Sequence, residues 1–129
     1  MARVLLVDDE ELLLTVLKTL LRTKGYEVLT AQDGYTALEL VKSAKPEVVI
    51  SDIRMNPMNG LELLRHIRRE CPDLPVVMLT GYSTAETEEE TKALGAFGYL
   101  RKPFVMDDVI RTVRAAVETA QQKGAPPPA

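Results

Sequence analysis

The sequence predicts a doubly wound α/β domain, in which helices cover both faces of a parallel sheet. Short apolar runs alternate with amphipathic segments along almost the whole chain, which is the pattern of strands joined by crossover helices. The apolar runs are continuous, as is typical of strands that are buried on both faces. With 129 residues, 46% of them hydrophobic, the chain can fill one domain with a full core.

The alternation begins at the N-terminus. Residues 4–7 are apolar without interruption and predict the first strand. Residues 11–24 place leucines and a valine at helical spacing, which predicts the first helix. Gly25 follows this segment and is a typical residue for ending a helix. Residues 27–31 then predict a weaker second strand.

The middle of the chain continues the pattern. A short second helix around residues 37–41 must end before Pro46, because the residue before a proline disfavours helical geometry. Residues 48–50 predict a third strand of the fully buried kind. Residues 61–70 carry leucines and an isoleucine at helical spacing and predict the third helix.

The fourth strand and helix follow directly. Residues 76–79 are apolar and predict another buried strand. Ser83 or Thr84 begins the fourth helix, and the order of Ser83 and Glu86 suggests a capping box between these two residues. Gly95 is expected to end this helix.

The last predicted elements lead into a proline-rich end. Residues 97–100 predict the fifth strand, and Asp107 and Asp108 open the last helix. We expect one domain over residues 1–122, followed by a flexible tail or linker stub over residues 123–129, because three consecutive prolines cannot continue a helix.

The composition argues against several functions. The net charge is −3, with both signs spread along the chain, so neither direct binding to nucleic acid nor a polybasic membrane patch is expected. No apolar run approaches the ~20 residues of a membrane span. The N-terminus leads straight into a strand, and no signal peptide is expected. Cys71 is the single cysteine, which suits a reducing cytoplasm.

Polar side chains follow four of the predicted strands at the point where each strand ends. Asp8 and Asp9 follow the first strand, Asp52 the third, Thr80 the fourth and Lys102 the fifth. The carboxyl ends of parallel strands meet at one edge of the sheet, and ligands bind in the crevice at that edge. We therefore expect three carboxylates, a hydroxyl and an ammonium group to share one crevice.

The chemistry of this group suggests a hard cation and a phosphoryl group. Three carboxylates cannot all stay ionised side by side without a counter-charge, so either a pKa rises or a cation lies between them. Oxygen ligands without histidine or cysteine favour Mg²⁺ over zinc. A lysine and a threonine beside a carboxylate suit phosphoryl transfer to an aspartate.

On these residues the chain resembles the response-regulator receiver domains of two-component signalling, which have a CheY-like, flavodoxin-like fold. The match runs from residue 3 to about residue 120 and is closest to the receivers of nitrogen-regulatory-type activators. The resemblance implies a three-layer (βα)5 sandwich with the strand order 2-1-3-4-5. The motifs that carry it are residues 7–10 (VDDE), 51–55 (SDIRM), 58–60 (MNG), 78–82 (MLTGY) and 99–104 (YLRKPF).

The resemblance implies a phosphorylation-operated signalling switch, and not an enzyme that turns over an external substrate. Asp52 would accept the phosphoryl group of a phosphohistidine on a sensor histidine kinase or a phosphotransfer protein. Mg²⁺, or Mn²⁺ in its place, would be held by Asp9, Asp52 and the backbone carbonyl of Arg54. Asp8 would assist directly or through water.

The remaining site roles are also implied by the resemblance. Thr80 and Lys102 would bind the phosphoryl oxygens, and a cis peptide bond between Lys102 and Pro103 would aim the lysine. Tyr99 would turn inward when Thr80 moves and so change a partner-binding surface. The alternative for an aromatic residue on this strand is ordinary packing.

Two further side chains are expected to control how long the phosphoryl group survives. Arg54 lies two places after Asp52, and Tyr82 two places after Thr80. Both side chains are large, and both would flank the in-line approach of water to an aspartyl phosphate. We expect slow self-dephosphorylation unless both side chains point to solvent.

One segment departs from the usual pattern of the family. Receivers usually carry proline directly after the methionine that follows the phosphoacceptor segment. Here Asn56 follows Met55, Pro57 comes one place late, and Asn59 stands where aspartate is usual. Pro57 is expected to push Asn56 towards extended geometry. This loop should therefore differ locally, without loss of any site residue.

Two other functions compete with the signalling switch. Haloacid-dehalogenase-type phosphatases also use a strand-end aspartate with Mg²⁺, but their second aspartate, two places on, is replaced here by Arg54. A receiver that binds partners without being phosphorylated would not need the five site residues.

For the signalling switch, the expected partners are a kinase and either an effector or an output domain beyond residue 129. A second copy of the chain is a further expected partner after phosphorylation.

Overall fold

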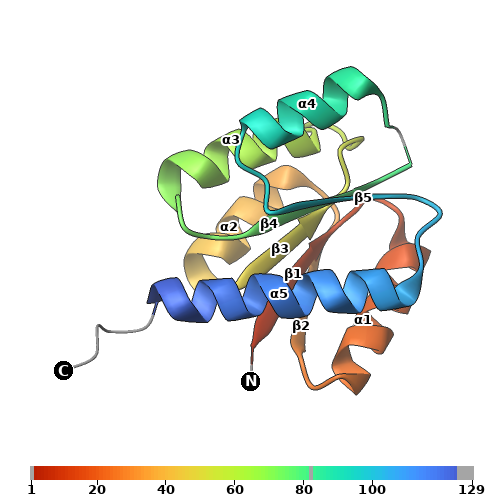
Figure 1. The fold of residues 1–129 in the computed structure, drawn as a ribbon, viewed down its shortest axis with the longest axis vertical. Coiled ribbons are helices and arrows are strands. Elements are labelled where there is room, and N and C mark those ends of the chain that lie inside the picture. The colour runs from red at the N-terminus through yellow and green to blue at the C-terminus, as the bar shows by residue number, and fades with distance from the viewer. Residues whose placement is uncertain (1, 82, 125–129) are drawn as a thin grey trace.

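The structure is a computed structural model that describes residues 2–81 and 83–124; the side chains of residues 122–124 are not described. Five strands and five helices alternate along these residues (Figure 1). The strands are β1 (Arg3–Val7), β2 (Glu27–Ala31), β3 (Val48–Ser51), β4 (Val76–Thr80) and β5 (Gly98–Arg101). The helices are α1 (Glu11–Thr23), α2 (Gly34–Ala44), α3 (Gly60–Glu70), α4 (Ala85–Ala93) and α5 (Met106–Gly124).

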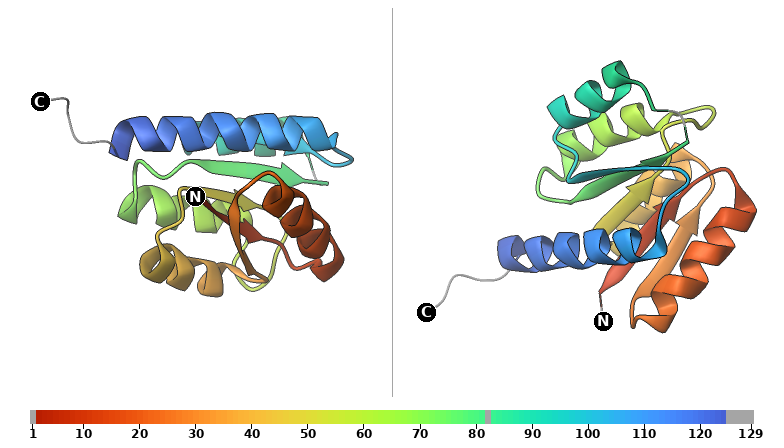
Figure 2. Two further views of the ribbon diagram at one scale, coloured as in Figure 1. Left: turned by 90° about the horizontal axis from the view of Figure 1, so that it is seen from below. Right: turned by 45° about the vertical axis from the view of Figure 1, so that its right-hand side comes forward.

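The strands form one parallel sheet in the order β2-β1-β3-β4-β5, as predicted. Successive residues of a strand face opposite sides of the sheet, so β1 contributes Val4 and Leu6 to one core cluster and Leu5 and Val7 to the other. The helices α1 and α5 cover the first face, while α2 and α3 cover the second. Figure 2 shows α5 on the opposite side of the sheet from α2. The three-layer sandwich predicted from the sequence is confirmed.

Most helix ends follow from local sequence. Gly25 and Gly95 adopt positive φ angles of 92° and 83° just after α1 and α4, a geometry that costs glycine little because it has no Cβ. The helix α2 ends at Ala44, before Pro46. The helix α5 continues to Gly124, and residues 125–129 of the predicted tail lie outside the described residues.

The sequence offered Ser83 or Thr84 as the start of α4, and the capping box differs from the prediction. Thr84, and not Ser83, is the N-cap, and its hydroxyl accepts a hydrogen bond from the Thr87 backbone N–H at 3.0 Å. The Thr87 hydroxyl in turn accepts from the Thr84 N–H at 3.0 Å. The capping box is thus shifted by one residue from the predicted Ser83–Glu86 pair. A threonine at the third helical position can replace the expected glutamate, because its hydroxyl also reaches the backbone N–H of the N-cap residue.

Within residues 2–81 and 83–124, two peptide bonds before proline are cis, Asn56–Pro57 and Lys102–Pro103. The second has the geometry that the family resemblance implied. The first lies in the loop where the sequence departs from the family pattern, and its cis geometry was not predicted. No helix among residues 2–81 and 83–124 is long and apolar enough to cross a bilayer.

Candidate functional site

The first two carboxylates of the site follow β1 but differ in exposure. Asp8 is buried, with 4% of its surface accessible, whereas Asp9 is exposed. Asp8 accepts a hydrogen bond from the Glu10 backbone N–H at 2.9 Å. Glu10 is the N-cap of α1 and makes no capping bond through its side chain. Asp8 therefore helps to order the start of α1, but its second carboxylate oxygen points to other partners.

Asp52 is placed beside Asp8 by strand pairing. Its backbone N–H donates to the Val7 carbonyl oxygen at 3.0 Å, which continues the β1–β3 ladder by one residue. The residue is 8% exposed, and Oδ1 accepts a long hydrogen bond of 3.4 Å from the Arg54 N–H. Beneath Asp8 and Asp52 lie apolar side chains, among them Leu14 and Leu79. The two carboxylates thus stand on an apolar floor and open towards solvent on one side.

The three carboxylates meet as the sequence predicted. Asp8, Asp9 and Asp52 each offer an oxygen, and these oxygens lie within 4.8 Å of one another. Like charges at this spacing repel strongly where water is partly excluded. A divalent cation with a preference for oxygen ligands relieves that repulsion, and the donor set contains carboxylates alone. The geometry therefore fits Mg²⁺ or a similar hard ion.

Lys102 supplies the positive charge of the site. Its Nζ lies 3.1 Å from Asp8 Oδ2 and 3.4 Å from Asp52 Oδ2. Burial lowers the pKa of Lys102, but the hydrogen bond to Asp8 and the charges of Asp52 and Asp8 outweigh burial, so the pKa is raised overall. The ammonium group therefore stays charged throughout the neutral range. The stability that it adds is present below the ordinary lysine pKa and is lost only as the pH rises through the raised value.

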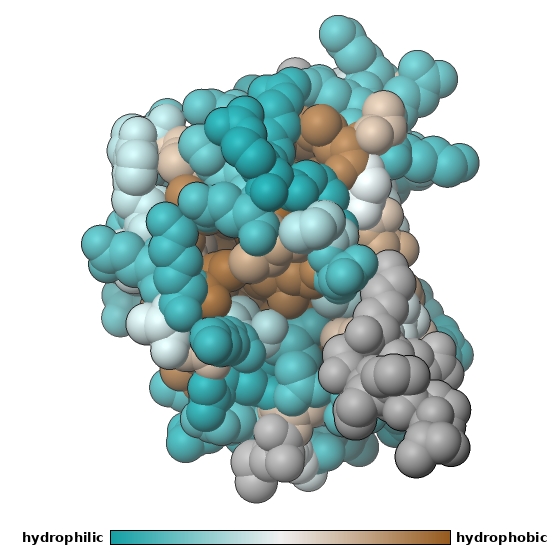
Figure 3. Space-filling model, turned by 90° about the vertical axis from the view of Figure 1, so that its left-hand side faces the viewer, coloured by the Kyte–Doolittle hydropathy of each residue, from teal (hydrophilic) through white to brown (hydrophobic). Residues whose placement is uncertain are grey.

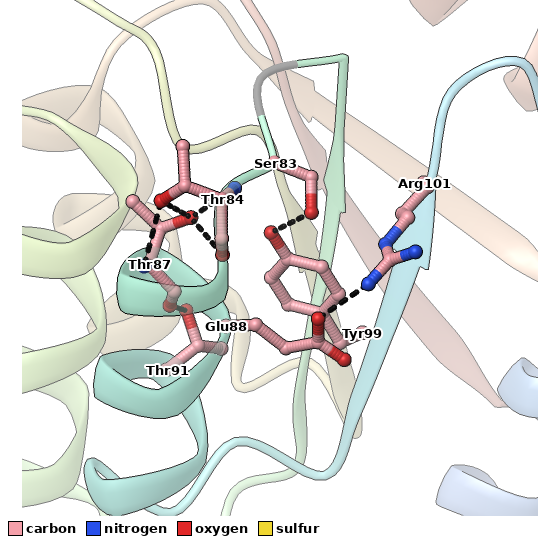
Figure 4. A network of polar contacts seen from close by, with 7 residues as sticks. All are labelled: Ser83, Thr84, Thr87, Glu88, Thr91, Tyr99 and Arg101. Atoms are coloured by element: carbon pink, nitrogen blue, oxygen red, sulfur yellow. Dashed lines mark hydrogen bonds and ion pairs between the residues drawn. The ribbon is translucent and has the colours of Figure 1, made fainter.

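Thr80 and Tyr99 lie on neighbouring strands at this edge. Thr80 ends β4 and is fully buried, and its carbonyl oxygen accepts the Lys102 backbone N–H at 2.7 Å. This bond brings Lys102 to the carboxylates across a separation of 94 residues from Asp8. Tyr99 is not among the carboxylates. It is partly buried, and its hydroxyl donates to Ser83 Oγ at 3.0 Å beside the start of α4 (Figure 4).

The mouth of the site is an open pocket of about 590 Å³. Asp9 and Arg54 line it together with Asn59, the N-cap of α3, and Thr87, the third residue of α4. The exposed Arg54 side chain thus borders the space next to the acidic cluster. Tyr82, the second predicted control on phosphoryl lifetime, lies outside the described residues. The pocket is large enough to admit a phosphoryl group together with part of its donor.

The opposite edge of the sheet carries a mainly apolar pocket. A pocket of about 380 Å³ at the amino ends of β3 and β4 is lined mainly by apolar atoms, from Val41, Pro46, Leu74, Pro75 and Ala120 among others. Figure 3 shows this face, where hydrophobic residues line a hollow. The carboxylate cluster and the lysine lie only at the carboxyl ends of the strands. The contrast supports the carboxyl edge as the functional one.

Sequence reasoning missed one contributor to the site and one ion pair beside it. Gly60 begins α3 so close to Asp52 that a Cβ on residue 60 would lie 2.1 Å from the Asp52 carbonyl oxygen. The residue was recognised only as part of the MNG motif, with no role of its own. Arg101, which forms an ion pair with Glu88, was also missed, since nothing in the sequence marks which charges of α4 and β5 face each other.

Comparison with known proteins agrees with this geometry. The family model of the response regulator receiver domain matches residues 4–114. The regulatory protein AtoC of Escherichia coli (strain K12) is 37% identical over 121 residues, which cover 94% of this chain and 26% of AtoC. The DNA-binding transcriptional regulator NtrC of the same organism is 37% identical over 120 residues, or 93% of this chain and 26% of NtrC. The chain thus spans about a quarter of the length of these two relatives.

Solved structures show the same fold. The chemotaxis protein CheY4 of Vibrio cholerae is 37% identical and superimposes with a TM-score of 0.84, over 90% of this chain and 98% of CheY4. A CheY-like response regulator receiver domain protein from Methanospirillum hungatei JF-1 is 27% identical, with a TM-score of 0.91 over 96% of this chain and 99% of that protein.

Proposed function

Because the chain belongs to the family of response-regulator receiver domains, we propose that it is a switch that accepts a phosphoryl group on Asp52. The donor would be a phosphohistidine of a sensor histidine kinase or of a phosphotransfer protein. One observation carries the proposal. Asp52 is held between two further carboxylates and the Lys102 ammonium group, at the carboxyl edge of a parallel sheet.

The residues suit an in-line transfer. An oxygen of Asp52 would attack phosphorus, a P–O bond would form, and the P–N bond would break with its electron pair returning to the imidazole of the donor. Lys102 lies 3.4 Å from Asp52 Oδ2 and can pair with a phosphoryl oxygen there. The Thr80 hydroxyl would bond a second phosphoryl oxygen.

A divalent cation completes the charge balance. Asp9, Asp52 and the Arg54 carbonyl would hold Mg²⁺, or Mn²⁺, with Asp8 ligating directly or through water. When bound, the ion would neutralise the phosphoryl oxygens during transfer. Asp9 suits first contact with the ion because it is exposed and borders the open pocket.

The test is uptake of one phosphoryl group from acetyl phosphate by the wild-type protein. Uptake should require Mg²⁺ or Mn²⁺ and should stop with excess chelator, as intact mass spectrometry would show. Uptake unchanged in chelator would contradict the metal assignment. A parallel assay with p-nitrophenyl phosphate should show no turnover, because Arg54 stands where the haloacid-dehalogenase type has its second aspartate.

Output from the switch would come through protein contacts. We propose that phosphorylation changes a surface made by α4, β5 and α5, with Thr80 and Tyr99 as the moving residues. AtoC and NtrC are about four times as long as this chain, and both are regulators by name. This supports an output domain beyond residue 129 or a separate effector. We also propose cytoplasmic location and phosphorylation-dependent pairing of two copies.

Arg54 is proposed to prolong the phosphorylated state. Its side chain borders the pocket through which water would reach the phosphoryl group, and small misplacements of an attacking group change rates greatly. Arg54→Ala should therefore lose its phosphoryl group about ten-fold faster than wild type after the donor is removed. Asn56→Ala, which changes another residue lining the same pocket, is the matched control. Equal decay in wild type and Arg54→Ala would refute the shielding. The same comparison with Tyr82→Ala tests the second predicted residue.

A further inference from the structure

The helix α4 buries far less apolar surface than its neighbour α3. Its sequence is AETEEETKA, and Thr91 is its one buried residue. The Thr91 hydroxyl is satisfied within the helix, where it donates to the Thr87 carbonyl oxygen at 2.7 Å. In contrast, α3 buries three leucines and an isoleucine. Burial of an apolar face is what usually attaches a helix to a sheet, so α4 needs other attachments.

Two ion pairs provide such attachments, one to each neighbouring element. Glu88 Oε2 lies 2.5 Å from Arg101 Nη2 on β5, and Glu90 Oε1 lies 2.5 Å from Arg65 Nη2 on α3. All four side chains are between 39% and 64% exposed. The pairs are therefore open to solvent and to screening by salt.

The Glu88–Arg101 pair also connects α4 to the functional site. Arg101 pairs in register with Thr80 and directly precedes Lys102. The Tyr99 side chain lies between this ion pair and Ser83, whose hydroxyl it contacts (Figure 4). A shift of α4 that breaks the ion pair must therefore also alter the surroundings of Tyr99 and the end of β5.

The size of the effect decides what the pairs can do. An exposed ion pair changes an equilibrium by roughly 1.5- to 5-fold. Such a factor is negligible against the folding equilibrium of a domain, which is on the order of 10³ to 10⁸. The same factor matters for the balance between two native conformers. The minor conformer often has a population on the order of 0.1–10%, and a change of this size alters that population several-fold. The pairs are thus suited to set a conformational balance.

We propose that α4 is a separately detachable helix, and that the Glu88–Arg101 and Glu90–Arg65 ion pairs set how often it detaches. Detachment breaks the Tyr99–Ser83 contact, so ionic strength and a competing charged partner can both bias the switch. The link to signalling rests on the proposed phosphoacceptor function. The attachment itself does not, because it is a property of the unphosphorylated chain.

Hydrogen–deuterium exchange of the α4 amides in the unphosphorylated protein tests the attachment. Glu88→Gln and Glu90→Gln should each raise the exchange rate of α4 by about two- to five-fold at low salt, and the double variant by the product of the two factors. Added salt should raise the rate in wild type and leave the double variant nearly unchanged. The urea midpoint for global unfolding should fall only slightly in the single variants, because a two- to five-fold factor is small against a folding equilibrium on the order of 10³ to 10⁸.

Glu89→Gln is the matched control, because it removes the same charge from the same helix and Glu89 has no ion pair among residues 2–81 and 83–124. Equal exchange rates in the Glu88→Gln, Glu90→Gln and Glu89→Gln variants would overturn the proposal. An exchange rate of wild-type α4 that does not change with salt concentration would also overturn it.

Ser83→Ala combined with Glu88→Gln tests the connection to Tyr99. Non-additive effects on α4 exchange support the connection, and additive effects overturn it. Phosphoryl uptake enters none of these measurements, so their failure is distinct from failure of the proposed function.

Discussion

Asp52→Asn is expected to abolish phosphoryl uptake from acetyl phosphate in the presence of Mg²⁺. The amide has nearly the shape of the carboxylate but lacks the charged oxygen that attacks phosphorus, so the reaction loses its nucleophile. The fold should be kept, because one of three crowded carboxylates is neutralised. Intact mass spectrometry should show the wild type gaining one phosphoryl group and the variant gaining none.

Asp33→Asn is the control for this experiment. Asp33 caps α2 through a bond from the Thr36 N–H to its side chain, and asparagine caps helices about as well as aspartate. This variant should take up the phosphoryl group at the wild-type rate. If Asp52→Asn were labelled to the wild-type level, the phosphoacceptor would be another residue and the assignment of the site would be wrong.

Gly60→Ala is expected to cause the largest loss of stability among single changes near the site. A Cβ at residue 60 would lie 2.1 Å from the Asp52 carbonyl oxygen and 2.8 Å from the Ile53 Cα, and both are backbone atoms. They cannot rotate away, so β3 and α3 must separate. We expect a loss of about 3 kcal/mol in the free energy of unfolding, measured by urea denaturation. Phosphoryl uptake should also slow, because the displaced backbone carries the Asp52 side chain.

Gly81→Ala provides the comparison, since its new Cβ would meet only the Lys102 side chain, at 3.7 Å, among the neighbours within 4 Å. That distance is an ordinary van der Waals contact. Gly81→Ala should therefore unfold at nearly the wild-type urea concentration. If the Gly60 and Gly81 variants were equally stable, the crowding at Asp52 would not limit the substitution.

Much of the fold could be predicted because it depends on local patterns. Residues 48–50 and 76–79 are continuously apolar, and they lie in the central strands β3 and β4. The predicted ends of α1 and α4 are correct because glycine alone takes the required positive φ at low cost. The sequence left the cap of α4 open between Ser83 and Thr84 and placed the capping box one residue early, since both residues are good caps and only the path of the loop selects between them.

For the candidate site, the sequence could predict which residues lie together at the carboxyl edge of the sheet. Asp8, Asp9 and Asp52 each follow an apolar run, and a parallel sheet brings the carboxyl ends of its strands together. The switch role of Tyr99 remains a prediction, although the structure gives this residue a hydroxyl contact with Ser83.

The sequence by itself therefore determined the order of the elements and the chemistry at the carboxyl edge, because both follow from the periodicity of apolar residues and from what ends each strand. Only the tertiary structure decided which atoms meet. It placed Lys102 Nζ 3.1 Å from Asp8 Oδ2, left Gly60 no room for a Cβ, and tied α4 to β5 through Glu88 and Arg101. These contacts join residues far apart in the chain. Their distances depend on strand register and helix packing, which local sequence patterns do not determine.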